Sequence, residues 1–122
     1  MKANPYDKFL GPEDRLHIAC CDFLDLQYPK LLYTHPANEA KRTPFERYKA
    51  KKLRMKPGVP DLLIFDPFGN FAGLAVEFKI KGNKLSNNQV EWKDRLYNRG
   101  WYVFTCYDLD TFMNLINDCY GK

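Results

Sequence analysis

The sequence predicts a single-domain α/β fold, in which a mixed β-sheet is flanked by α-helices. Segments with helical and with strand character alternate along the chain. The 122 residues are 45% hydrophobic, which is enough to form one core. We find no internal repeat, low-complexity tract or linker. One domain is therefore expected over residues 1–122.

The first predicted helix covers residues 12–27. Pro12 suits the first helical turn, and the acidic residues after it favour the positive end of the helix dipole. Apolar side chains then recur every three or four residues, as on one face of a helix. This apolar stripe consists of Leu16, Ala19, Cys20, Phe23 and Leu26.

A second, strongly basic helix is predicted after Thr43. Thr43 can cap it and Glu46 stands three residues later, as in a capping box. Phe45 and Tyr48 are expected to face inward, with most of the cations outside. Pro57 and Gly58 are expected to stop the helix.

The remaining segments alternate between strands and capped helices. Strands are expected at 30–34, 61–65, 72–80 and 101–106. The second and third strands are expected to form a hairpin around the turn signals at 66–70. The fourth strand is expected to be buried on both faces. Ser86 caps a helix that carries Gln89 at its capping-box position, and Asp108 caps the last helix.

The positive charge of the chain is concentrated in residues 41–56. The net charge is +4, and this segment carries eight basic residues against one acidic residue, a net of +7. Such a concentration is typical of polyanion binding, although a solvated helix surface has the same pattern. The DNA-binding candidates are Lys41, Arg42, Arg47, Lys49, Lys51, Lys52, Arg54 and Lys56.

The cysteines and apolar runs exclude other classes of protein. The four cysteines form no C-x-x-C pair, and only His17 and His35 are available beside them, so a zinc site is disfavoured. Reduced thiols in a cytosolic protein are the simpler interpretation. No run approaches the roughly 18 apolar residues of a membrane span, and residues 1–10 lack the apolar region of a secretory signal.

The predicted hairpin brings two carboxylates together. If it pairs symmetrically about Gly69, Asp61 stands directly opposite Glu77, and both point to the same face of the sheet. Lys79 shares that face because it lies two residues beyond Glu77, whereas Phe78 points the other way. A bulge in the hairpin would shift the register by one residue and remove this juxtaposition.

Two opposed carboxylates and a lysine are suited to phosphodiester hydrolysis. The carboxylates repel each other unless a cation lies between them, and oxygen ligands suit Mg²⁺ or Mn²⁺. The metal would lower the pKa of a bound water and neutralise charge on the phosphate. The ammonium of Lys79 would orient the water, help deprotonate it, or stabilise the transition state. The same residues also occur together by chance.

The motifs around these residues resemble a known nuclease family, and the resemblance implies a domain core between about 12 and 117. K-P-G-V-P-D-L-L-I-F (56–65), followed by G-L-A-V-E-F-K (73–79), resembles the PD-(D/E)xK superfamily with its restriction-endonuclease-like core, and within it the VRR-NUC family. The glutamine early in the next helix of that family matches Gln89. Its acidic residue in the first helix matches Glu13, and a polar pair before the basic helix matches Asn38 and Glu39.

The resemblance implies a Mg²⁺-dependent endodeoxyribonuclease in which Mn²⁺ substitutes. Asp61 and Glu77 would bind the metal with the carbonyl of Phe78, and Lys79 would be the catalytic lysine. Two further catalytic candidates follow from the resemblance. They are Glu13, acting directly or through water, and Gln89 at the edge of the site. A first-turn helix acid and a capping residue are the respective structural alternatives for these two. Asn38 would join the DNA-binding residues.

Small stand-alone members of this family resemble phage or bacterial homodimers that cut branched DNA such as four-way (Holliday) junctions. We therefore expect a homodimer that acts on branched DNA in the cytosol of a bacterium or a phage-infected cell. Three alternatives remain at this point: a DNA-binding module that does not cut, a protein-interaction domain, and a general or restriction-like nuclease.

Overall fold

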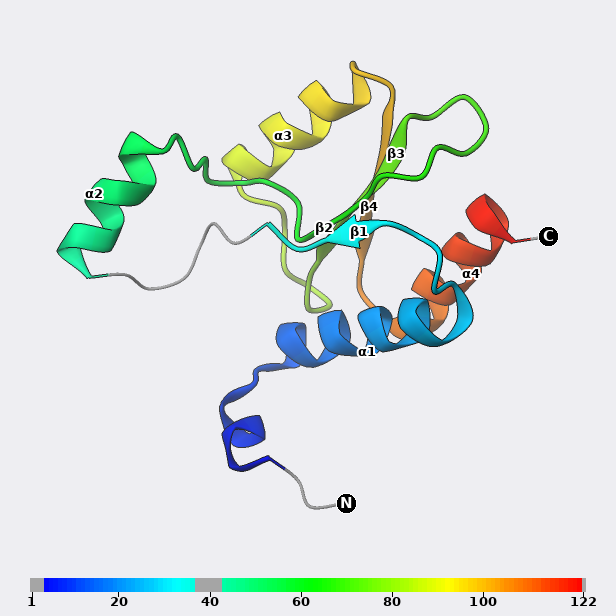
Figure 1. The fold of residues 1–122 in the computed structure, drawn as a ribbon, viewed down its shortest axis with the longest axis horizontal. Helices are drawn as coiled ribbons and strands as arrows, with labels where there is room; N and C mark the ends of the chain where they lie inside the picture. Colours follow the sequence, from blue (N-terminus) through cyan, green and yellow to red (C-terminus); the bar gives the residue numbers. More distant parts are fainter. Residues whose placement is uncertain (1–3, 37–42, 122) are drawn as a thin grey trace.

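A four-stranded mixed sheet forms the centre of the protein (Figure 1). The computed structural model describes residues 4–36 and 43–121. The strands lie in the order β1 (Tyr33–Thr34), β2 (Leu62–Ile64), β3 (Gly73–Phe78) and β4 (Trp101–Cys106). The first three pair antiparallel and β4 runs parallel to β3. The predicted α/β class is confirmed.

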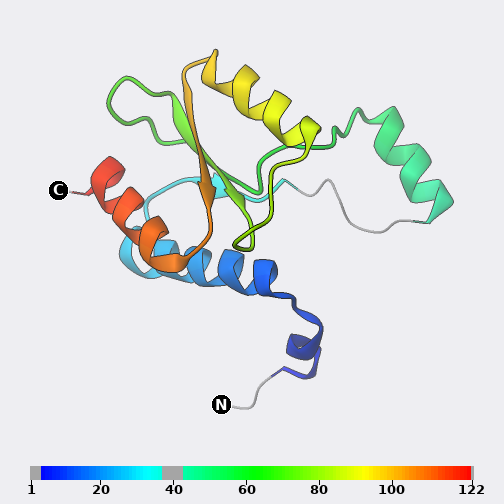
Figure 2. The ribbon, with the colours of Figure 1, turned by 180° about the vertical axis from the view of Figure 1, so that it is seen from behind.

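Three of the four described α-helices cover the two faces of this sheet. The four helices are α1 (Pro12–Gln27), α2 (Pro44–Lys52), α3 (Asn87–Tyr97) and α4 (Leu109–Tyr120), and α2 is the one that does not pack on the sheet. The pair α1 and α4 packs on one face and α3 on the other, as the two opposite views show (Figures 1 and 2). A short 3₁₀-helix at Pro5–Phe9, capped by the side chain of Asn4, was not predicted. None of the described helices has the length and apolar character needed to cross a membrane.

The alternation of side chains along β3 separates the core from the site. Leu74, Val76 and Phe78 belong to the buried cluster that α1 and α4 complete. Ala75 and Glu77 point to the opposite face, towards α3. Glu77 is 5% exposed and is the one charged residue among the described residues that is buried.

Two burial predictions need correction. Leu26 is 77% exposed, and Leu24 is buried in its place because it lies one turn after Cys20 on the face that packs. In β4 only Cys106 is fully buried, whereas residues 101–105 are half-buried. The reason is that β4 is an edge strand and pairs with β3 alone.

The basic helix α2 does not pack as predicted. It stands away from the sheet in Figure 1 and packs on none of the other described helices and strands. Phe45 is 72% and Tyr48 53% exposed, so the prediction that they face inward is wrong. The predicted capping box of Thr43 is present, but the helix ends before Pro57. Arg54 adopts a left-handed conformation with φ 65°, which closes the last turn.

Candidate active site

The register of the hairpin places Asp61 opposite Glu77. Residue numbers of partners in β2 and β3 add to 138, as in the pair Leu62 and Val76, so the next position outward pairs 61 with 77. The prediction of this register is confirmed. The turn itself is not symmetric about Gly69, because Phe68 pairs with Phe71. One extra residue is therefore accommodated between the turn and the strands, outside the part that carries the carboxylates.

Asp61 is held in place by the strand opposite. Its Oδ2 accepts a hydrogen bond of 2.8 Å from the backbone N–H of Phe78. Because β2 begins only at Leu62, this side chain takes the place of a backbone partner at the end of the sheet. The carbonyl of Phe78 points to the same side as its N–H in an extended strand. A carboxylate has about four acceptor sites, so one hydrogen bond leaves capacity for a cation.

Glu77 is held by α3 through the side chain of Gln89. The Nε2 of Gln89 donates to Glu77 Oε1 at 2.8 Å, and its Oε1 accepts from the backbone N–H of Ser86 at 2.8 Å. The second bond fixes which end of the amide faces Glu77, since a backbone N–H only donates. Both sequence interpretations of Gln89 hold together: it caps α3 and it contacts the acidic pair.

Lys79 continues the same row of side chains. Its backbone N–H donates to the carbonyl of Cys106 at 2.9 Å, which extends the pairing with β4 beyond the end of β3. The side chain is half-buried and, by alternation along the extended chain, shares the face of Glu77. Asp61, Glu77 and Lys79 are thus ordered on one face at the end of the two central strands.

Two histidines that sequence reasoning did not assign to the site border it. The Nδ1 of His35 donates to the backbone carbonyl of Asp61, since a carbonyl oxygen only accepts. The ring of His17 stacks on Phe78 with centroids 4.7 Å apart and meets the ring of His35 edge-on at 4.7 Å. Their positions in the sequence are too far apart for any spacing rule to link them.

The environment favours the neutral form of His17. Burial lowers the pKa of His17, and the neighbouring His35 lowers that pKa further. The carboxylates of Asp61 and Asp14 act in the opposite direction. A neutral imidazole beside Phe78 adds no positive charge that would compete with a cation at the acidic pair.

Glu13 lies on α1 at the border of the same region. It is half-buried and stands one turn before His17, so the two share a face of the helix. Within residues 4–36 and 43–121, however, no three His, Cys, Asp or Glu side chains gather closely enough to hold one ion. Glu13 is therefore not assembled with Asp61 and Glu77 into a three-carboxylate group.

The helix α2, which carries most of the described basic candidates, stands away from the sheet that holds the acidic pair (Figure 1). Asn38, Lys41 and Arg42 fall outside the described residues. The other candidates are exposed on α2 and on the segment after it; they are Arg47, Lys49, Lys51, Lys52, Arg54 and Lys56. Residues 57–60 then lead from this segment to Asp61. The basic helix and the acidic pair are thus neighbours along the chain, but they do not form one compact site.

The donor set at the end of β2 and β3 suits Mg²⁺. Two carboxylates face each other, Glu77 is nearly inaccessible to water, and the backbone carbonyl of Phe78 adds a neutral oxygen on the same side. Mg²⁺ is usually held in proteins by one or two carboxylates and keeps several of its waters. The side chains present therefore fit this ion without a third acidic ligand.

Comparison with known proteins agrees with the fold. The family model of the VRR-NUC domain matches residues 12–108. A solved structure described as a VRR_NUC domain protein has 23% identity and a TM-score of 0.75, covering 91% of this chain and 89% of that chain. A second, described as a VRR_NUC domain, has 22% identity and a TM-score of 0.59, covering 88% and 97%. No curated protein matches the chain.

The mixed sheet with helices on both faces defines a single-domain α/β fold that the VRR_NUC structures share. Within that fold class the family match spans most of the chain and includes every strand and the helices α1, α2 and α3. The chain belongs to the VRR-NUC family, a family of nucleases.

Proposed function

We propose that this protein is a metal-dependent DNA endonuclease that hydrolyses phosphodiester bonds. The observation that supports the proposal is the hairpin register, because its continuation beyond Leu62 and Val76 sets Asp61 opposite the buried Glu77. Lys79 shares the face of Glu77 by strand alternation. Magnesium, or manganese in its place, would lower the pKa of a bound water and neutralise charge on the scissile phosphate. A buried carboxylate opposite a second one is costly without such a cation.

Each residue of the site has a separate task in this proposal. Asp61 and Glu77 bind the ion with the Phe78 carbonyl, and the hydrogen bonds to the two side chains keep them in register. Lys79 orients the attacking water and stabilises the phosphorane-like charge. Glu13 acts through water, because it is not assembled with the acidic pair.

We further propose that the substrate is branched DNA and that the enzyme is a homodimer. The exposed cations of α2, with Asn38, Lys41 and Arg42, would bind the phosphate backbone. The uncovered apolar side chains of α2 support contact with a second copy, namely Phe45, Tyr48 and Leu53. Two-fold symmetry would set two active sites against two strands of a four-way junction.

We also propose that the protein acts in a reducing compartment. All four cysteines are free, and the buried thiols of Cys20 and Cys106 lie in contact without forming a disulfide. This favours a bacterial or phage-infected cytosol.

The test is cleavage of labelled four-way junction, splayed-arm and linear duplex DNA with Mg²⁺, with Mn²⁺ and with chelator. Cutting of the branched substrates, the junction and the splayed arm, but not of the linear duplex is the expected result, and chelator should abolish it. Equal cutting of all three substrates would support nuclease activity and refute the selectivity for branched DNA. DNA binding without any cleavage would refute the proposed enzymatic activity.

A further inference from the structure

A groove of about 470 Å³ runs along α3 beside the candidate active site. One wall is the segment at Lys56 and Pro57, and the other is the side of α3 that carries Trp92 and Leu96. Its volume lies within the range of roughly 300–1,000 Å³ that is typical of sites for small organic molecules. The functional site described above uses none of these α3 side chains.

Both walls of the groove lead directly into the acidic site. The chain continues from Pro57 to Asp61 within four residues, and the helix wall begins beside Gln89, which hydrogen-bonds Glu77. The two walls touch at Gly58, where a Cβ atom would lie 2.5 Å from the backbone of Asn88. The groove therefore adjoins the site and is not a separate depression.

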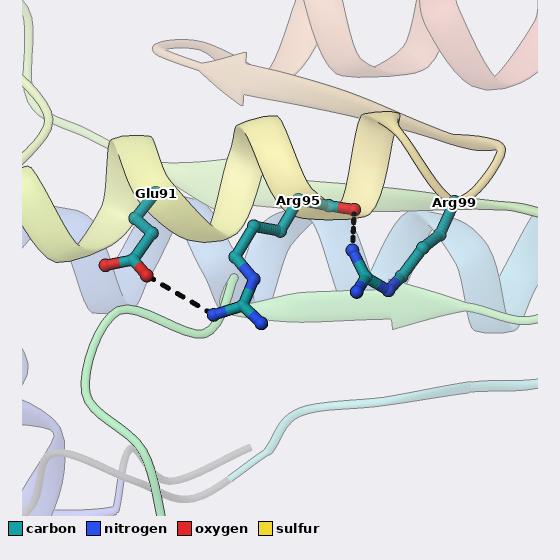
Figure 3. A network of polar contacts seen from close by, with 3 residues as sticks. All are labelled: Glu91, Arg95 and Arg99. Carbon is teal, nitrogen blue, oxygen red and sulfur yellow. Dashed lines mark hydrogen bonds and ion pairs between the residues drawn. The ribbon is translucent and has the colours of Figure 1, made fainter.

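The lining combines apolar surface with positive charge. Arg95 and Arg99 line it, and Figure 3 shows both side chains on the same side of α3. Arg95 forms an ion pair of 3.3 Å with Glu91, and the two side chains are 64% and 60% exposed. Exposed pairs of this kind contribute little to stability, so a phosphate can replace the carboxylate. Arg99 donates one of its five N–H groups to the Arg95 carbonyl.

We propose that this groove binds a short segment of one DNA strand that is unpaired at the branch point, next to the scissile bond. A base of that segment would lie against Trp92, and its phosphates would lie on Arg95 and Arg99. The faces of an unpaired base are exposed and can stack on the indole and the apolar surface of the groove. In a duplex the faces of the bases are covered by neighbouring base pairs. The guanidinium groups suit phosphate oxygens. From Gln89 to its end at Tyr97 the helix rises roughly 12 Å, about three to four nucleotide steps at duplex spacing, and Arg99 follows in the next turn of the chain. The inference rests on the proposed function, because it takes DNA as the substrate.

The experiment compares binding of a duplex that carries an oligothymidine tail with binding of the same duplex with blunt ends, in chelator so that no strand is cut. The variant is Arg95→Gln with Arg99→Gln, which removes both positive charges and keeps polar, hydrogen-bonding side chains. Lys93→Gln is the matched control, since Lys93 loses the same charge from the same helix but lines a different hollow with Tyr97.

The double variant should bind the tailed duplex at least about fivefold more weakly and the blunt duplex almost normally. Its salt slope on the tailed duplex should fall by roughly 1.4, because two phosphate contacts on a single strand are lost. The control should match the wild type. Trp92→Phe, which keeps an aromatic face, should retain more tail affinity than Trp92→Leu.

Unchanged tail affinity, or equal losses on tailed and blunt DNA, would overturn the assignment of the groove to a single strand. Failure of the proposed function has a different signature, because then the wild type would cut no DNA with metal present. A wild type that cuts normally while the double variant keeps its tail affinity would reject the groove alone.

Discussion

At the scale of single residues, the site depends on side chains that hydrogen-bond its acidic residues and so fix their positions. Gln89 is one such residue, because it connects the start of α3 to Glu77 through its amide. His35 is another, because it holds the backbone carbonyl of Asp61. The acidic pair follows from the hairpin register, which the sequence predicts. The position of His35 does not follow from that register, because its contact with Asp61 depends on how the chain after β1 passes the end of the sheet.

Gln89→Leu should lower cleavage about 10- to 100-fold and raise the Mg²⁺ concentration needed, since it removes the hydrogen bond that orients Glu77. The measurement is a cleavage rate over a magnesium titration. Ser86→Ala is the matched control, because it removes the cap of α3 without touching Glu77. It should cost about 0.5–2 kcal/mol of stability and leave the rate nearly unchanged. Equal rates in wild type and Gln89→Leu would refute the positioning role.

At the scale of elements, sequence patterns locate the helices and strands better than they locate packing. The caps at Thr43, Ser86 and Asp108 are local interactions, and all three are present. Whether a helix is covered is not a local property. The aromatic side chains of α2 look inward-facing in the sequence, yet no described element packs on them.

Replacing Lys49, Lys51 and Lys52 of α2 with alanine should weaken DNA binding without destabilising the fold. The helix packs on no other described element, and alanine favours helix formation. If all three contact phosphates of a duplex, the slope of log affinity against log salt should fall by roughly 2.7. Binding across a salt series and thermal unfolding are the two measurements. An unchanged slope would mean that α2 does not contact DNA.

The cap of α4 should make stability depend on pH at the acid end. Asp108 accepts hydrogen bonds from the backbone N–H and the hydroxyl of Thr111, and these hold the pKa of its carboxyl below the usual value. The folded pKa is thus lower than the unfolded value of about 3.9. The stabilisation is present above that value and is lost as the pH falls through the folded pKa.

The stability difference between wild type and Asp108→Asn should therefore shrink as the pH falls below about 4, because asparagine caps the helix without titrating. Denaturant unfolding of both proteins over this range measures it. A difference that does not vary with pH would contradict the assignment.

At the scale of the whole molecule, a core on one face of the sheet leaves the other face and the sheet end for function. The core side chains of β3 point to α1 and α4, while Glu77 points to α3. The alternation of β3 and the length of the hairpin made this arrangement predictable. The direction of α2 and the groove along α3 were not predictable, because they depend on tertiary placement of segments that no periodic pattern records.

The proposed homodimer can be tested on the exposed face of α2. Phe45→Ser together with Tyr48→Ser should shift the protein from dimer to monomer in sedimentation experiments, because these side chains are exposed in the single chain. Phe9→Ser is a matched control, since Phe9 is also exposed but lies outside α2. A wild type that is monomeric at all concentrations would contradict the proposal.

The most direct test of the central claim is the rate of Mg²⁺-dependent DNA cleavage by Lys79→Ala beside that of Lys81→Ala. Lys81 is exposed two residues further along the chain and belongs to no part of the proposed site. We predict that Lys79→Ala abolishes cleavage while DNA affinity stays close to that of the wild type, and that Lys81→Ala cuts normally. Full cleavage by Lys79→Ala would contradict the assignment of Asp61, Glu77 and Lys79 as the catalytic centre.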